Sequence, residues 1–193
     1  MYSEQGNGPL ISVKGSKVAL GPYTYDHHKM TLVSLQDPAV AVLSGNTFDI
    51  ANPELDLEHF KTLAKNAALF TVFEIENLEV IGNCGLREID YRQGTATFGI
   101  SIFRKDFWGK GCGTEATRLT VDYGFRFLNL HNIYLRVTGF NERAQNAYLK
   151  AGFKEIGRRR EAVLIGNRRY DVIFMDCLHA DFISPVPGWS LPF

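Results

Sequence analysis

The sequence predicts a single α/β domain with a mixed, mostly antiparallel sheet and flanking helices. Strand-like apolar runs follow one another across short turns, at Arg92-Gln93-Gly94 and at Gly166-Asn167, as antiparallel hairpins do. A glycine-rich segment at 109–113 instead joins a strand-like run to a helix-like one, which indicates an α/β unit. The length of 193 residues, of which 45% are hydrophobic and 22% charged, suits one compact domain.

The chain before residue 70 predicts an edge strand followed by helices. A short apolar run over 18–22 is the expected strand, and a helix is expected over 26–35, where Asp37-Pro38 follows. Residues 40–43 form a further short apolar segment. Asn52-Pro53 is a good helix start, because asparagine caps a helix and proline suits its first position. Apolar residues then recur at helical spacing, at Leu57, Phe60, Leu63, Ala64 and Ala67.

The middle of the chain predicts a three-stranded antiparallel meander that leads into the glycine loop. Strands are expected over 70–75, 80–91 and 95–103, with turns between them. A helix over 116–130 is expected after the loop. Its apolar stripe consists of Ala116, Leu119, Tyr123, Phe127 and Leu130.

The last third predicts a strand, a short helix and a hairpin. Ile133, Leu135 and Val137 alternate with polar residues, as in a half-buried strand. The helix is expected over 142–151, where Gly152 is a natural stop. Two strands over 153–164 and 168–178 would form the hairpin.

These elements divide the chain into three parts. The domain is expected over residues 17–180, after a polar, flexible leader at 1–16. The tail at 181–193 is rich in proline and aromatic residues. We expect its apolar side chains to pack on their own domain or on a second subunit, and favour a homodimer. They are Phe182, Val186, Trp189, Leu191 and Phe193.

Charge and cysteine content limit the class of protein and its partners. Lysine and arginine together number 21, and so do aspartate and glutamate, so the net charge is zero and a nucleic-acid partner is not expected. Cys84, Cys112 and Cys177 form no disulfide framework and no metal-ligand spacing, which indicates a cytoplasmic protein without a metal site. No apolar run approaches the ~20 residues that span a bilayer, so no membrane partner is expected.

The glycine loop predicts an anion site. Because glycine carries no Cβ, a ligand can approach the backbone of the loop closely. The free N–H groups of the following helix then favour a phosphate. A Walker loop would need Lys-Ser or Lys-Thr after the last glycine, where this chain has Thr114-Glu115. A dinucleotide fingerprint fits loosely at Gly111, Gly113 and Ala116, but the next strand ends without a carboxylate. An acyl-CoA transferase is the third class that uses such a loop.

Two motifs resemble a known family. The loop Trp108-Gly109-Lys110-Gly111-Cys112-Gly113 is followed by Asn141-x-x-Ala144-x-x-x-Tyr148-x-x-x-Gly152-Phe153. In this order and on these elements, the motifs resemble those of the GNAT N-acetyltransferases. Trp108 departs from the family pattern, which has Gln or Arg there. The amino-acid sequence of the loop is most similar to that of the subgroup that includes ribosomal-protein N-terminal and polyamine acetyltransferases.

The resemblance implies a GNAT-like sheet with a splayed pair of parallel strands, between which acetyl-CoA binds. The strand before the loop would bond the pantetheine arm and the loop would hold the pyrophosphate, while two residues of the second motif would contact the cofactor. Arg104 and Lys105 would add positive charge nearby. The implied cofactor-binding residues are Ile100, Ser101, Ile102, Phe103, Trp108, Gly109, Lys110, Gly111, Cys112, Gly113, Thr114, Asn141 and Asn146.

Tyr148 is the implied catalytic residue, whose hydroxyl would protonate the departing CoA thiolate. The same helical stripe also fits a Tyr148 that only packs in the core, and Asn141 also fits a helix cap. Cys112 has no adjacent histidine and is expected to be a small filler. No base for the acceptor amine is evident. Glu88 and Asp90 are candidates, although surface charge fits each of them better. Glu54, Asp56 and Glu58 could attract a cationic acceptor, but they equally suit a helix N-terminus, which is the preferred interpretation.

The sequence therefore predicts an acetyl-CoA-dependent N-acetyltransferase that acts by direct attack. The acceptor would be a primary amine, either a protein N-terminal α-amine or a small amine such as a polyamine. Two alternatives stay open at this stage. One is an acyl-CoA-binding sensor or inactive module with the same fold, and the other is a dinucleotide-binding protein.

Overall fold

A computed structural model describes residues 8–45 and 53–185 of the chain, and it contains one eight-stranded sheet. The strand order is β1-β2-β3-β4-β5-β6-β8-β7. The strands are β1 (Val13–Lys14), β2 (Val18–Pro22), β3 (Ala68–Glu74), β4 (Val80–Asp90), β5 (Thr95–Ile102), β6 (Asn132–Thr138), β7 (Lys154–Ile165) and β8 (Arg168–Leu178).

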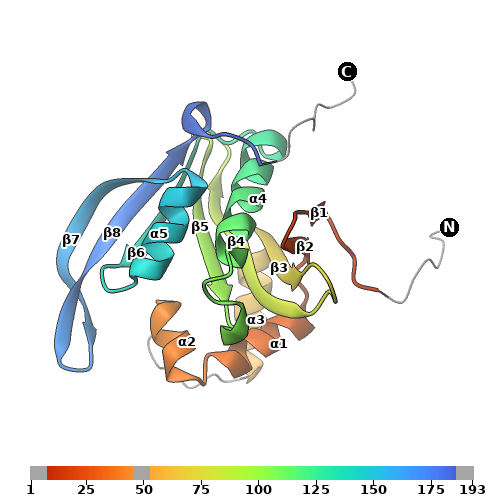
Figure 1. The fold of residues 1–193 in the computed structure, drawn as a ribbon, viewed down its shortest axis with the longest axis horizontal. Coiled ribbons are helices and arrows are strands. Elements are labelled where there is room, and N and C mark those ends of the chain that lie inside the picture. Colours follow the sequence, from red (N-terminus) through yellow and green to blue (C-terminus); the bar gives the residue numbers. More distant parts are fainter. Residues whose placement is uncertain (1–7, 46–52, 186–193) are drawn as a thin grey trace.

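Five α-helices accompany the sheet in the described residues. Figure 1 shows the first three gathered at one end of the sheet and the β7–β8 hairpin at its far edge. The helices are α1 (Tyr25–Ser34), α2 (Pro38–Leu43), α3 (Pro53–Ala64), α4 (Cys112–Phe127) and α5 (Glu142–Ala151). No helix among these residues is both long and apolar enough to cross a membrane.

The pair β5–β6 is parallel, and every other recorded pair of neighbouring strands is antiparallel. Its pairing covers only Thr95–Asn132, Ala96–Ile133 and Thr97–Tyr134. Both strands continue beyond this point without pairing to each other, so they splay apart. The predicted mixed sheet with a splayed parallel pair is confirmed. A dinucleotide-binding domain would instead need a series of parallel strands.

The two faces of the sheet carry different helices. On β4, Cys84 faces α4, where its sulfur lies 3.0 Å from Thr120 Oγ1. Asn83 faces the other way, and its amide donates to Thr31 Oγ1 of α1 at 2.9 Å. Because side chains alternate along a strand, α4 covers one face and α1 the opposite face at this point. The main hydrophobic core lies between the sheet and α4.

Glu115 fastens the start of α4 to the start of the sheet. One of its carboxylate oxygens accepts from the Ser16 backbone N–H at 3.0 Å, and the other accepts from those of Lys17 and Val18 at 2.6 and 2.8 Å. Burial alone would raise the pKa of Glu115, but these hydrogen bonds outweigh it and hold the pKa below its ordinary value. The glycine loop therefore begins a helix that is tied to β2.

Several boundaries differ from those expected. Val13–Lys14 pair with β2, so ordered structure begins before residue 17. The apolar segment at 40–43 is part of α2, because Asp37 caps it by accepting from the Ala39 N–H at 2.9 Å. The helix expected over 116–130 begins at Cys112 and ends at Phe127. Phe182 of the tail packs against Phe125, while the remainder of the tail, 186–193, lies outside the described residues.

Candidate functional site

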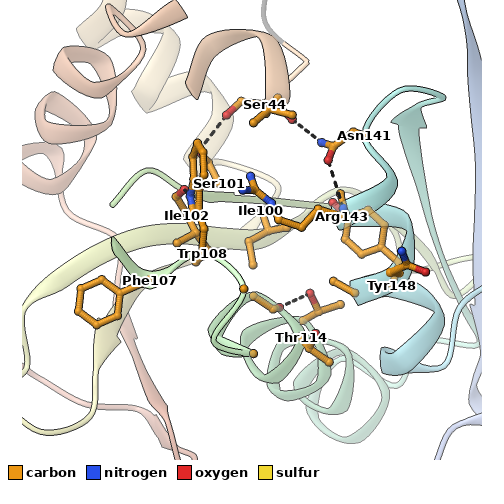
Figure 2. A pocket seen from close by; sticks show the side chains of 18 of the residues that line it. Ser44, Ile100, Ser101, Ile102, Phe107, Trp108, Thr114, Asn141, Arg143 and Tyr148 are labelled. Carbon is orange, nitrogen blue, oxygen red and sulfur yellow. Dashed lines mark hydrogen bonds between the residues drawn. The ribbon is translucent and has the colours of Figure 1, made fainter. Parts of the chain in front are cut away.

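A cavity of about 320 Å³ lies where β5 and β6 part. Figure 2 shows its side chains arriving from β5 (Ile100 to Ile102), from the glycine loop and the start of α4 (Trp108, Thr114), and from α5 (Arg143, Tyr148). Main-chain groups of β5 beyond Thr97 have no partner on β6 and can pair with an extended ligand. The cavity is therefore suited to a long, thin molecule with an anionic end near the loop.

The conformation of the glycine loop supports anion binding. Gly109 and Gly111 have φ values of 75° and 88°, a left-handed conformation that favours glycine. Gly111 is the residue before α4, so the first N–H groups of that helix lack helical partners and carry its positive dipole end. A Cβ on Gly113 would stand 3.8 Å from Ile102 Cγ1, beside the cavity. A larger side chain at Gly113 would enter the space that a ligand needs.

Trp108 and Arg143 close one side of the cavity. The Trp108 indole donates to the Ile102 backbone oxygen at 2.6 Å, which anchors the loop to β5. Arg143 stacks on this indole with its guanidinium carbon 3.8 Å from the ring centroid, and both residues line the cavity. Sequence reasoning missed Arg143, although it lies two residues after Asn141 in the second motif.

Most residues predicted to bind the cofactor line this one cavity. They are Ile100, Ser101, Ile102, Trp108, Gly109, Gly111, Gly113, Thr114, Asn141 and Asn146. The cavity lining does not include Phe103, Lys110 or Cys112. Cys112 belongs to the buried core, where burial raises the pKa of its thiol.

The nearby cations expected to help bind phosphate are mostly engaged elsewhere. Arg104 pairs with Asp106 and Glu79, and Lys105 pairs with Asp37 at 2.5 Å. Lys110 places its ammonium 5.2 Å from the centroid of the Phe107 ring. None of these three cations lines the cavity, whereas Arg143 and Lys150 of α5 do, and Arg143 lies against the loop residue Trp108.

Asn141 caps α5 and also joins it to α2. Its side-chain oxygen accepts from the Ala144 N–H at 3.2 Å, and its amide donates to the Leu43 backbone oxygen at 3.0 Å. Asn141 is buried and lines the cavity. The helix-cap interpretation is thus confirmed, and a contact with the cofactor stays a prediction.

Tyr148 lies where this cavity meets a second one. Its ring is 8% exposed and packs edge-on against Phe98, with 6.2 Å between centroids. Burial raises the pKa of Tyr148 to about 12. The side chain lines both cavities, and no hydrogen bond of its hydroxyl is recorded with the described residues. The ring belongs to the core, as one interpretation proposed, but its position at the junction also suits proton donation.

The second cavity has a volume of about 1,110 Å³ and extends from β5 toward α1 and α3. It shares Ile100, Ser101, Asn141 and Tyr148 with the first cavity. An acyl group carried in the first cavity would therefore meet a molecule bound in the second at these residues. We call this second cavity the acceptor cleft.

A buried hydrogen-bonded chain lines the acceptor cleft. The His28 ring lies 2.9 Å from Asp56 Oδ1 through Nε2 and 3.1 Å from the Tyr23 hydroxyl through Nδ1. Tyr23 in turn lies 2.9 Å from Thr31 Oγ1. Asp56 Oδ2 is buried and has no recorded hydrogen-bond partner among the described residues. The preferred interpretation of Asp56 as a residue that suits a helix N-terminus is therefore incomplete, because its carboxylate also contacts His28 of α1.

The two acidic residues considered on β4 have different surroundings. Asp90 accepts from the Arg92 and Gln93 backbone N–H groups and so holds the turn before β5. Glu88 lines the acceptor cleft, where it accepts from the Thr97 hydroxyl at 2.6 Å. Of this pair, Glu88 is the one that faces the place where an acceptor amine would lie.

Comparison with known proteins points to the same chemistry. A family model described as an acetyltransferase (GNAT) domain matches residues 17–154. The chain is 34% identical over 131 residues to the spermidine N(1)-acetyltransferase of Vibrio cholerae, across 68% of this chain and 75% of the relative. It is 27% identical over 101 residues to the putative ribosomal N-acetyltransferase YdaF of Bacillus subtilis, across 52% of this chain and 55% of the relative.

A solved structure agrees with these relatives. Spermidine N-acetyltransferase from Vibrio cholerae, in complex with CoA and spermine, superposes with a TM-score of 0.77 and 27% identity. The match covers 86% of this chain and 98% of that one.

Proposed function

The chain belongs to the GNAT acetyltransferase family, and we propose that its cleft transfers the acetyl group of acetyl-CoA directly to a primary amine without an acyl-enzyme. The sequence prediction of this family and of its ribosomal-protein and polyamine subgroup is confirmed by the family match and the relatives. The protein is an N-acetyltransferase and uses acetyl-CoA. The observation that carries direct transfer is the meeting of two cavities at Ile100 and Tyr148.

In the proposed complex, acetyl-CoA occupies the cavity between β5 and β6. Its pyrophosphate lies on the N–H groups at the start of α4, with Arg143 close by. Its pantetheine arm runs along the unpaired main chain of Ile100 to Ile102. The thioester then lies near the junction, where Tyr148 and the acceptor cleft meet. The ten residues that line the cavity support this arrangement.

The proposed reaction is a single addition and elimination at the thioester carbon. The neutral amine attacks this carbon, a C–N bond forms, and the C–S bond breaks with both electrons going to sulfur. Tyr148 gives its proton to the leaving thiolate, and the nitrogen gives its proton to a base in the cleft, for which Glu88 is the proposed carboxylate. A phenol with a pKa of about 12 stays protonated at working pH, so its proton is available when the thiolate leaves.

The acceptor class includes small amines and protein N-terminal α-amines. Spermidine, which the names of the relatives identify as their substrate, is one small amine of this class. We also propose a cytoplasmic location, which the three unpaired, buried cysteines support. A homodimer is the assembly that the apolar residues of the tail favour.

Release of free CoA thiol from acetyl-CoA, measured over a panel of amines, tests this function. We expect saturable turnover that depends on the amine and yields an N-acetylated product by mass spectrometry. Acetylation of thiols or hydroxyls alone would contradict the N-acetyl assignment. CoA binding without turnover of any amine would favour the sensor or inactive module instead.

A further inference from the structure

Three arginines from separate strands line the acceptor cleft: Arg87 of β4, Arg136 of β6 and Arg159 of β7. Strand register places Arg136 and Arg159 on one face of the sheet. Val172 pairs with both Thr138 and Arg159, and Arg136 lies two residues before Thr138. Paired and alternate residues of a sheet share a face, so the two arginine side chains project from the same side.

Arg87 projects from this side as well. It pairs with Thr97, which pairs with Tyr134, and Tyr134 lies two residues before Arg136. Its guanidinium lies over Gly99, since a Cβ built on Gly99 would overlap Arg87 Nη2. Gly99 is next to Ile100, the residue at which the two cavities meet. The charge of Arg87 is thus close to the expected position of the thioester.

These three arginines are exposed to solvent in the cleft, and they outnumber the two described carboxylates that line it, Asp56 and Glu88. Arg104, Arg126 and Arg158 each form an ion pair with an aspartate or glutamate. Among the described residues, no ion pair or hydrogen bond of Arg87, Arg136 or Arg159 is recorded. Asp56 and Glu88 bond His28 and Thr97 rather than an arginine. With three arginines against two carboxylates, the described lining keeps an excess of positive charge, which attracts an anion.

The backbone beside two of these arginines is unusual. Pairing of β4 with β5 shifts between Arg87 and Asp90, and Glu88 has a φ of 52°. Pairing of β7 with β8 shifts between Arg159 and Val163, where Glu161 has a φ of 49°. A left-handed glutamate is unfavourable, and β-bulges redirect neighbouring side chains and are frequent beside functional sites. The bulges lie directly beside Arg87 and Arg159, so they help to set the direction of these two side chains.

We propose that the acceptor amine of this enzyme carries an anionic group, a carboxylate or a phosphate, which Arg87 binds beside the junction of the two cavities while the charges of Arg136 and Arg159 attract it into the cleft. This inference rests on the proposed amine acetylation and narrows its substrate class. Guanidinium groups bind both anions through paired N–H donors. A polyamine would instead bring additional ammonium groups toward the arginines. Although relatives carry spermidine in their names, this cleft therefore favours acceptors of the opposite charge.

Matched acceptors test the charge directly. The carboxylate arm compares 4-aminobutyrate with 1,4-diaminobutane, which has an aminomethyl group in place of the carboxylate. The phosphate arm compares O-phosphoethanolamine with ethanolamine. We expect kcat/KM to be at least tenfold higher for the anionic member of one pair, and the arm that responds identifies the anion. Equal or better use of the non-anionic member in both pairs would overturn the proposal while leaving amine acetylation intact.

Variants assign the effect to the arginines. Arg87→Gln, and the triple change of Arg87, Arg136 and Arg159 to glutamine, should raise KM for the anionic acceptor at least tenfold and leave ethanolamine nearly unaffected. Arg160→Gln is the matched control, because Arg160 is an exposed neighbour on β7 outside the cleft lining. An unchanged preference in the folded triple variant would overturn the proposal.

A binding readout separates this proposal from the proposed function. N-acetyl-4-aminobutyrate and N-acetyl-O-phosphoethanolamine keep the anion but have no reactive amine. Calorimetry on the CoA-loaded protein should detect binding of one of them, weakened at least tenfold by the triple change. This result would support the anion site even if no amine were acetylated, whereas absence of binding by both compounds would contradict it.

Discussion

Arg143 stacks on Trp108, with 3.8 Å between the guanidinium carbon and the centroid of the ring. Trp108 stands where the family pattern has Gln or Arg, so the loop position itself lacks a polar or charged side chain. Arg143 of α5 brings a positive charge back to the same wall of the cavity. Arg143, held on the Trp108 ring, thus supplies a cation beside the glycine loop.

Arg143→Gln should weaken acetyl-CoA binding about tenfold, because one charge-assisted contact to a phosphate is lost. The loss should shrink at high ionic strength, which screens the interaction. Calorimetry at low and high salt measures both effects. Arg160→Gln is the control, and an equal loss in that variant would show that only net charge matters.

Gly113→Val should lower CoA affinity with little change in melting temperature. The added side chain faces the cavity near Ile102, and no positive φ is recorded for Gly113. Gly111→Val should lower affinity and melting temperature together, because Gly111 has a φ of 88°. Calorimetry and thermal unfolding separate the two variants. Undiminished CoA affinity in both variants would contradict the assignment of the glycine loop to the cofactor site.

Tyr148→Phe should reduce turnover about 10²-fold or more, as expected on loss of a general acid. Acetyl-CoA affinity should change little, since phenylalanine keeps the packing against Phe98. The pKa of Tyr148 is raised to about 12, so the phenol stays protonated below that value and its ionisation should not reduce the rate between pH 7 and ~10. Steady-state rates, with single turnover used to exclude slow product release, provide the measurement. A chemical step at near wild-type rate in Tyr148→Phe would show that Tyr148 is a core residue and not the general acid.

Glu115→Gln should lower the melting temperature in a pH-dependent way. The folded-state pKa of Glu115 is below its ordinary value, so its stabilisation is present above the unfolded pKa of ~4.3 and is lost as pH falls through the folded pKa. The difference in melting temperature between the wild type and Glu115→Gln should therefore be large at pH 7 and shrink toward pH ~3. A difference that is constant over this range would indicate that the charge of Glu115 is unimportant.

Deletion of residues 186–193 should lower the mass in light scattering or the melting temperature, if the apolar tail covers a surface. The deletion keeps the contact between Arg118 Nη2 and the Ile183 backbone oxygen, so the end of the described domain is preserved. Unchanged mass and melting temperature would contradict a role for the tail in assembly or packing.

The sequence by itself determined most elements and the cofactor side of the site. Helical and alternating periodicities depend on neighbouring residues, so they could be read along the chain for α4 and β6. The glycine loop and the second motif lie close together in the sequence, so their spacing could be recognised without the structure. This spacing predicted the position of the loop and of Tyr148. Boundaries were less certain at α2 and at the start of α4, where capping by Asp37 and the left-handed Gly111 decided them.

Only the tertiary structure decided which distant residues form the acceptor side. His28 and Asp56 lie 28 residues apart in sequence, and their contact depends on how α1 packs beside α3. Arg87, Arg136 and Arg159 share one cleft because sheet order and register bring β4, β6 and β7 side chains to the same face. No local pattern encodes such register, since it is set by packing across the whole sheet. The loop that binds the cofactor is therefore readable in sequence, whereas the surface that selects the acceptor emerges on folding.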